Sequence, residues 1–397
     1  MSAVPEQDTP TRAELVARAA SLRPLLEANA DRTDHNRRVA DENIEAAQKA
    51  GLFRITVPKR YGGYESDFGT LVAVAAELAK GCASTSWVVS LINTNGWLMA
   101  GWSKQVQDEI WADNPGARCV GVLAHNGRVE RVPGGLLVTG EWPWTSGIWH
   151  AQWTSAGVLL PREDGASEPG VVVMPVQDIS VKDTWLTVGM RGTGSNTIVA
   201  DRVFVPDHRV IKVSRFVGGN YDTEFKDEVL YRAAIIPVTS LILVGPLLGM
   251  ASAALEHVLE KAPKRAITHT NYHAQKDSAT FQTSVAKAAL TIDGAYLQAF
   301  HAAQEIDQAA IDDRYPEALE RAQIRGHSGH VAQLCREAVD RLVSAHGAST
   351  FSESNKLQRI WRDLNVASRH AFLNSEVNYE IYGKALLDVQ PNITDLI

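Results

Sequence analysis

"GMRGTGSNTIVADRVFVPDHRV", residues 189–210, joins a glycine-rich turn to a run of β-branched and aromatic residues that ends at Pro206. Such residues favour strands, and glycine and proline mark the turns between them. Short runs of the same kind fill the chain from about 118 to 213 and include 128–142, 151–160 and 170–181. Among them, "VPGGLLV" (132–138) is typical of a hairpin. The pattern predicts a small antiparallel β unit, a barrel or sandwich of about seven or eight strands.

Helical patterns lie on both sides of this unit. Residues 11 to about 115 carry apolar residues at helical spacing, with a break around Pro58. From about 225 four long periodic segments follow, typical of an up-and-down bundle, and 357–387 is the last of them. The predicted fold is mainly α with a central β domain. Its predicted parts are an N-terminal helical domain (1–117), a β domain (118–215) and a C-terminal four-helix bundle (216–397).

The composition predicts an ordinary globular protein of the cytoplasm. Of 397 residues 45% are hydrophobic, and the net charge of −7 offers no basic stripe for nucleic acid. The three cysteines Cys82, Cys119 and Cys335 are far apart and odd in number, which favours a reducing compartment over a disulfide framework. The polar start of the chain lacks an apolar signal core. The apolar run at 233–255 contains prolines and glycines, and we expect a buried helix there rather than a membrane span.

Several chemical motifs are missing from the sequence. No GxGxxG follows a strand, and no GxxxxGK[ST], HExxH or GxSxG occurs. "HSGH" (327–330) places two histidines three residues apart without a third ligand nearby, so we expect no metal site there. Dinucleotide-binding and metal-hydrolase classes are therefore disfavoured.

Tryptophans cluster in one part of the chain. Eight of the ten lie between residues 87 and 153. Core packing and a pocket for a flat ring system explain this clustering about equally well. Within the cluster, Thr145-Ser146-Gly147 could be either a simple turn or a hydroxyl group beside a heterocycle, and composition alone favours the turn.

Four stretches, 52–63 ("LFRITVPKRYGG"), 145–153 ("TSGIWHAQW"), 189–210 and 357–370 ("LQRIWRDLNVASRH"), together with the order of helices, β unit and bundle, resemble the acyl-CoA dehydrogenase superfamily. The resemblance extends from about residue 12 to 388. It is closest to the group D two-component flavin-dependent monooxygenases, which include aromatic hydroxylases. It implies reduced FMN or FAD from a separate NAD(P)H-dependent flavin reductase, O2, a C4a-hydroperoxyflavin and hydroxylation of an electron-rich aromatic substrate. That substrate would be indole-type, polycyclic or phenolic, from natural-product biosynthesis or aromatic catabolism, and the enzyme a homotetramer.

The resemblance also implies a set of site residues. The turn Trp144–Gly147 would lie against the flavin, with the Ser146 hydroxyl near N5 and Thr145 as second choice. Arg265 would meet the flavin phosphates of a neighbouring subunit, although the Gln-Phe-Gly that usually follows is absent. The implied cofactor-binding residues are Trp144, Thr145, Ser146, Arg191, Thr193, Ser195 and Arg265, the substrate-pocket residues are Trp87, Asn95 and Trp149, and the catalytic residues are His370, Ser146 and Asn95.

Two departures from the family patterns bear on the reaction and on the substrate. Where a dehydrogenase keeps its catalytic glutamate after the Arg-Asp pair, this chain has Ala371, preceded by His370. An imidazole of near-neutral pKa beside the flavin suits the monooxygenase reaction. Asn95 stands where phenol hydroxylases often have a histidine, and asparagine can orient a substrate but cannot take its proton. The alternatives are a dehydrogenase with a relocated base, an S- or N-oxidising monooxygenase, and a non-catalytic member of the fold.

Overall fold

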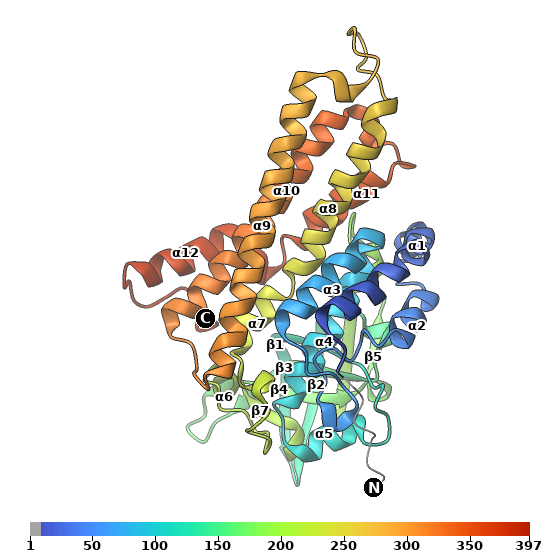
Figure 1. Cartoon of the computed structure of the whole chain (residues 1–397). Coiled ribbons are helices and arrows are strands. Elements are labelled where there is room, and N and C mark those ends of the chain that lie inside the picture. Colours follow the sequence, from blue (N-terminus) through green and yellow to red (C-terminus); the bar gives the residue numbers. More distant parts are fainter. Residues whose placement is uncertain (1–8) are drawn as a thin grey trace.

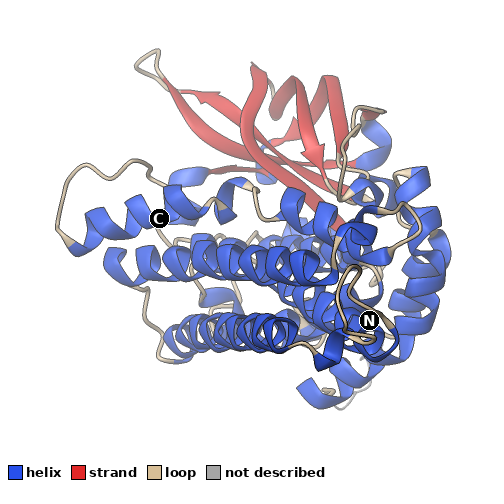
Figure 2. Ribbon diagram, turned by 90° about the horizontal axis from the view of Figure 1, so that it is seen from above, coloured by secondary structure: helices blue, strands red, loops and turns tan. Residues whose placement is uncertain are grey.

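The structure is a computed structural model, and it describes residues 9–397. A helical body carries one β sheet on its side, and a long bundle of helices extends away from both (Figure 1). Seen from above, the sheet forms a layer along one edge of the helical body (Figure 2).

The N-terminal part consists of five helices: α1 (Arg12–Asn36), α2 (Asp41–Lys49), α3 (Phe68–Gly81), α4 (Ala83–Ala100) and α5 (Lys104–Trp111). Thr11 begins α1 with a capping box to Glu14, and Asp67 caps α3 through the Thr70 amide. Nearly every residue of α4 is buried, because α3, the sheet and the bundle enclose it. The chain runs directly from α3 to α4 through Cys82, so the two helices pack against each other.

The sheet has seven strands: β1 (Cys119–Val132), β2 (Gly135–Thr145), β3 (Trp153–Pro161), β4 (Ser167–Pro175), β5 (Ser180–Lys182), β6 (Asn196–Pro206) and β7 (Val210–Lys212). Their order is β5-β6-β2-β1-β3-β4-β7. The predicted hairpin is confirmed, since Val132 pairs with Gly135 and Gly134 takes a φ of +80° in the turn.

The expectation of a purely antiparallel unit is wrong at one place. β1 and β3 run parallel, with Cys119 opposite Trp153. β2 lies on one side of β1, and residues 146–152 carry the chain across to the other side, so β3 enters the sheet in the direction of β1. This crossover holds the Ser146 turn at the end of the sheet that faces α4.

The C-terminal part contains α6 (Val213–Val217), α7 (Ile235–Leu241), α8 (Val244–Lys261), α9 (Ala279–Ile311), α10 (Ala318–His346), α11 (Lys356–Ala367) and α12 (Ser375–Leu386). Helices α8 to α11 form the bundle (Figure 1). The segment Ile235–Lys264 is long and apolar enough to cross a membrane, but 89% of its most apolar window is buried inside the protein, as expected for a core helix. The predicted domain limit at 117/118 falls between α5 and β1, and the limit at 215/216 falls within α6.

The expectation of one helix over 357–387 is wrong. The chain leaves α-helical geometry after Ala367, forms a 3-10 turn at Ala371–Leu373 and resumes an α-helix at Ser375. Two side chains favour the break: His370 accepts the Phe372 amide proton, and Asn374 caps α12 by accepting from the Val377 amide. His370 therefore lies in a connection between helices, not on a helix face.

Candidate active site

The crossover after β2 forms a strained turn. Trp144 takes a left-handed φ of 67° and is 69% exposed, and Gly147 follows with a φ of +76°. The Ser146 amide donates to the Trp144 carbonyl at 3.0 Å, and the Gly147 amide to the Thr193 carbonyl at 2.9 Å. A left-handed non-glycine residue costs about 1–3 kcal/mol and often marks a functional site. The turn thus presents Trp144 and Ser146 outward at the end of the sheet.

A row of hydroxyl groups lies behind this turn. Ser146 Oγ is 2.6 Å from Ser195 Oγ, which is 2.6 Å from Thr193 Oγ1. Trp87 Nε1 donates to Ser146 Oγ at 3.3 Å from the α4 side. Thr193 and Ser195 are buried at 2% and 3% exposure, whereas Ser146 keeps accessible surface. Only Ser146 in this row is placed to meet a ligand.

The expectation that Thr145 could be the second choice for the hydroxyl at the flavin edge does not fit the position of its side chain. Its side chain is fully buried, and its Oγ1 donates to the Trp142 carbonyl at 3.3 Å. Strand geometry explains this, because neighbouring residues at the end of β2 point to opposite faces. The Thr145 hydroxyl faces the core of the sheet.

The glycine-rich turn at 189–195 is fixed by α11 through the Arg-Asp pair. The Met190 amide donates to Asp363 Oδ1 at 2.5 Å, and Trp185 Nε1 donates to the Met190 carbonyl at 2.9 Å. Met190 has a left-handed φ of 52°. Burial raises the pKa of Asp363 to about 6, while the Met190 amide opposes that shift. Asp363 is therefore an anchor for this turn.

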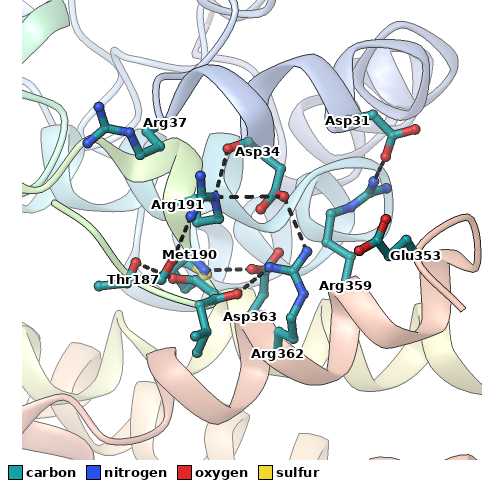
Figure 3. Close-up of polar contacts among 12 residues, drawn as sticks. Asp31, Asp34, Arg37, Thr187, Met190, Arg191, Glu353, Arg359, Arg362 and Asp363 are labelled. Atoms are coloured by element: carbon teal, nitrogen blue, oxygen red, sulfur yellow. Dashed lines mark hydrogen bonds and ion pairs between the residues drawn. The ribbon is translucent and has the colours of Figure 1, made fainter. Parts of the chain in front are cut away.

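Arg191 belongs to the same polar network. Figure 3 shows its guanidinium directed at α1, where Nε donates to the Asp34 carbonyl at 3.1 Å, and Nη1 donates to the Thr187 carbonyl at 2.9 Å. Arg362 Nη2 pairs with the Asp34 carboxylate at 3.2 Å in the same view. These contacts join α1, the turn and α11, and they give Arg191 a structural role. A flavin contact from Arg191 stays a prediction.

His370 lies at the centre of an aromatic group. Its ring meets Trp87 edge-on with centroids 5.8 Å apart, and Phe372 stacks against it at 6.0 Å and 30°. The Phe372 amide donates to Nδ1 at 3.3 Å, so the neutral ring carries its proton on Nε2. The structure thus brings His370, Trp87 and Ser146 together, as predicted.

The expected near-neutral pKa of His370 is wrong. His370 is an exposed residue of the single chain, but the protein atoms packed near its ring disfavour the charged form and lower its pKa to about 4. Neutral imidazole is therefore the form present at ordinary pH. It can donate a hydrogen bond from Nε2, but it holds no spare proton.

Two residues near His370 were missed from the sequence: Phe372, which stacks on its ring, and Arg325, which lies over Phe372. The Arg325 guanidinium lies 5.3 Å from the Phe372 ring centroid, and burial lowers its pKa to about 10. Arg325 Nε donates to Asn378 Oδ1 at 3.2 Å, and Nη1 donates to the Leu396 carbonyl. Arg325 lies on α10, some 45 residues before His370. No sequence motif links Arg325 to Phe372, so only the fold could reveal their contact.

Asn95 continues one stripe of α4. Trp87, Leu91 and Asn95 are four residues apart and share a face, and Leu91 is less buried than its neighbours on this helix. Asn95 Nδ2 donates to the Leu91 carbonyl at 2.9 Å, which turns Oδ1 outward toward Gly121 on β1. A methyl group on Gly121 would come within 2.7 Å of Asn95 Oδ1 and 2.1 Å of Ser155 Oγ. Ser155 Oγ is buried without a partner, so the three residues form a polar nook.

Some of the clustered tryptophans pack in the core, and others lie where a pocket for a flat ring could form. Trp97, Trp102, Trp111 and Trp142 are at most 2% exposed and belong to the core. Trp97, Trp111 and Trp142 donate to backbone carbonyls, as buried indoles usually do. Trp87, Trp144 and Trp149 instead border the Ser146 turn, and Trp149 lies beside Gly194 in the glycine-rich turn.

Arg265 lies outside this group, at the end of α8. It lines an open pocket of about 760 Å³ with Lys261, Lys264, Lys356, His257 and His346. The two histidine rings are 5.6 Å apart, and each has a buried Nδ1 without a partner. Burial and the nearby cations lower the pKa of both, that of His346 to about 4. The connection from α8 to α9 is at the far end of the bundle from the sheet (Figure 1).

These residues fit a flavin. Flat tryptophan faces and an exposed hydroxyl suit the ring system, and the cationic pocket with unpaired histidine nitrogens suits phosphate groups. The two places are separate within one chain, because Arg265 lies near His346 at the end of α10, whereas the connection that holds His370 contacts the middle of α10 through Gly329 and Arg336. Among residues 9–397, no group of three or more His, Cys, Asp or Glu is arranged to hold a metal ion.

Two family models match the chain. Residues 16–112 match the acyl-CoA dehydrogenase N-terminal domain, and residues 241–375 match the acyl-CoA dehydrogenase C-terminal domain.

Individual proteins match nearly the whole chain. It is 31% identical to the FADH2-dependent resorcinol hydroxylase, oxygenase component, of Rhizobium sp., over 98% of each chain. It is 30% identical to the flavin-dependent monooxygenase oxygenase subunit HsaA of Rhodococcus jostii, over 91% of this chain and 95% of that protein. The solved structure of XiaF from Streptomyces sp., in complex with FADH2 and glycerol, superposes with a TM-score of 0.91 at 38% identity, over 96% of this chain and 97% of XiaF.

Proposed function

This chain belongs to the acyl-CoA dehydrogenase superfamily, and within it to the oxygenase components of two-component flavin-dependent monooxygenases; from that premise we propose how its residues act. It is a flavin-dependent monooxygenase that works with a separate reductase on an aromatic substrate. Reduced FAD or FMN, when bound, supplies the two electrons with which one atom of O2 becomes water while the other enters the substrate. We add that the reductase draws these electrons from NAD(P)H.

The proposal rests on one observation: the fold places both His370 and Ser146 against Trp87. Ser146 contacts the polar edge of the ring system, and Trp87 forms a wall beside it. His370 donates a hydrogen bond from Nε2 into the same space and stays neutral, because its pKa is about 4. Trp144, Trp149 and His370 are exposed in the single chain, so a bound flavin and substrate would have to cover them before water is excluded and these hydrogen bonds strengthen. Ala371 leaves the position of the dehydrogenase base without a carboxylate.

The polar nook of Asn95, Ser155 and Gly121 orients the substrate in this proposal. Asn95 Oδ1 can only accept, so it favours a ring that carries a neutral N–H or O–H donor. The Ser155 hydroxyl has almost no accessible surface, so in this proposal Asn95 alone meets the substrate. An electron-rich ring needs no deprotonation, and Asn95 cannot supply it. Indole-type, polycyclic and neutral phenolic rings are the substrates that this nook fits.

We further propose a homotetramer in the cytoplasm. Leu290 and Leu297 on α9 are 72% and 67% exposed and share a face with Gly294, beside which the chain leaves open space. A second copy that covers this stripe would also bring the Arg265 pocket toward another subunit's flavin. All three cysteines are free and buried, which suits a reducing compartment.

The reaction can be tested with externally reduced flavin. The purified chain, mixed with chemically reduced FAD, O2 and an aromatic such as indole, should form hydroxylated product without any reductase present. Bleaching of bound oxidised flavin by an acyl-CoA thioester would instead favour a dehydrogenase with a relocated base.

A further inference from the structure

The hydroxyl row Thr193–Ser195–Ser146 can hold its protons in one favourable order. The Met190 carbonyl lies 2.8 Å from Thr193 Oγ1 and can only accept, so Thr193 donates to it. Thr193 then accepts from Ser195, and Ser195 accepts from Ser146, since each hydroxyl has one proton. At the other end Trp87 Nε1 can only donate, and it donates to Ser146. Ser146 is left with a lone pair and no proton to offer a ligand.

The reverse order of the protons is disfavoured at Thr193, where the row meets the Met190 carbonyl. It would set a Thr193 lone pair against the Met190 carbonyl oxygen at 2.8 Å. That carbonyl cannot easily move away, because the Met190 amide is held by Asp363 and its carbonyl also accepts from Trp185. Thr193 and Ser195 are nearly inaccessible, so no bulk water replaces a lost partner.

We propose that Thr193 and Ser195 are positioning residues that present Ser146 as a hydrogen-bond acceptor, and that this order makes the site prefer reduced over oxidised flavin. The inference rests on the proposed contact between Ser146 and flavin N5. Reduced flavin carries a proton on N5 and donates from it, whereas oxidised flavin has only a lone pair there. A Ser146 lone pair therefore attracts the reduced ring and repels the oxidised one.

The preference matches the needs of a two-component enzyme. The chain must capture reduced flavin made elsewhere and release it once oxidised. The row links this selection to α11, since Asp363 fixes Met190, Met190 orders Thr193, and Thr193 orders Ser195 and Ser146. The Arg-Asp pair thereby acts on the flavin edge without touching it.

The test compares the dissociation constants of oxidised FAD and anaerobically reduced FAD for each variant. Ser195→Ala frees the Ser146 proton to turn toward N5, so oxidised FAD should bind more tightly and the preference for reduced FAD should fall about three- to tenfold. The potential of the bound flavin, measured by dye equilibration, should shift by the matching amount. Thr193→Val preserves the side-chain shape and should move both values in the same direction.

Ser146→Ala is the matched control. Once Ser146 is alanine, the further change Ser195→Ala should no longer alter the ratio of the two constants. A Ser195→Ala variant that weakens both flavin forms by one factor, or leaves the ratio unchanged, overturns the inference, and if that variant does not fold, Thr193→Val decides by the same criterion. A wild-type protein that fails to hydroxylate any aromatic ring contradicts the proposed function instead. A wild-type protein that hydroxylates while Ser195→Ala keeps the ratio overturns only the hydroxyl row.

Discussion

At the scale of single residues, the proton of His370 has a fixed place. Nδ1 is occupied by the Phe372 amide, and the lowered pKa keeps the ring neutral. The ring thus acts as a positioned hydrogen-bond donor. A histidine with an ordinary pKa would instead become charged as the pH fell below about 6.5.

His370→Ala should uncouple the reaction. Loss of the Nε2 donor should lower the yield of hydroxylated product by about 10²-fold, with a matching rise in hydrogen peroxide. Flavin affinity should stay close to that of the wild type. Product and peroxide measured in parallel check this, and a variant with full product yield would remove His370 from the reaction.

The pH profile gives a second test of His370. Because its pKa is about 4, its donor form persists from pH 5 upward, and product yield per flavin should not fall between pH 8 and pH 5.5. Yield from chemically reduced FAD, measured across this range, checks the expectation. A fall in yield centred near pH 6.5, absent in His370→Asn, would show an imidazole that titrates normally.

Asn95 should discriminate among substrates, and the buried Ser155 beside it should not. Asn95→Ala should raise KM for indole about tenfold and leave N-methylindole unchanged, because only indole donates to Oδ1. Ser155→Ala removes a hydroxyl that has almost no accessible surface, so it should leave KM for both rings close to that of the wild type. Steady-state KM and kcat with these paired substrates separate the two residues, and equal losses for indole and its N-methyl analogue would contradict the nook.

At the scale of elements, Asp363 joins α11 to the glycine-rich turn, and its contribution to the stability of the fold depends on pH. Burial raises the Asp363 pKa to about 6, so between about pH 4 and pH 6 the folded state keeps a proton that the unfolded state releases. The stability due to this group is therefore present at acidic pH and is lost as the pH rises through 6. The contribution is on the order of 1–3 kcal/mol.

Asp363→Asn should remove this dependence of stability on pH. Asparagine can still accept from the Met190 amide, so urea unfolding should show similar stability to wild type at pH 5 and higher stability than wild type at pH 8. Asp201→Asn, on an exposed position of β6, is the matched control. A variant less stable than wild type at pH 8 would mean that the nearby arginines require an ionised carboxylate.

The exposed stripe on α9 predicts how copies associate. Leu290→Lys with Leu297→Lys should lower the mass measured by light scattering from that of four chains. If the Arg265 pocket serves a neighbouring flavin, FAD affinity should fall at least tenfold in the same variant. Leu387→Lys, at an exposed leucine after α12, is the control. An unchanged mass would exclude this stripe as the interface.

At the scale of the whole molecule, periodicity and turns predicted the arrangement well. The β texture from 118 to 213, the hairpin at Pro133-Gly134 and the buried apolar run all have local causes. The parallel β1–β3 pair has no local cause in the sequence, because it depends on the chain crossing from β2 past β1 to the other side of β1. The break at 368–374 depends on side-chain caps that an apolar period does not register.

Only those residues of the site that belong to sequence motifs could be predicted from the sequence. His370 and Ser146 came from a register in the sequence and meet at Trp87. The lowered pKa of His370 comes from burial in the folded chain, where Trp87 of α4 lies against its ring, and the setting of Asn95 includes Gly121 of β1. The order of the hydroxyl row likewise requires the Met190 carbonyl, which α11 places.

Isotope labelling tests the central claim most directly. The chain is mixed with chemically reduced FAD and ¹⁸O2 in the presence of indole or a phenolic ring, and the product is weighed by mass spectrometry. We expect one ¹⁸O atom in the product, obtained without a reductase, and about 10²-fold less labelled product from His370→Ala. Release of all the oxygen as hydrogen peroxide with every aromatic ring, together with reduction of bound flavin by an acyl-CoA thioester, would contradict it.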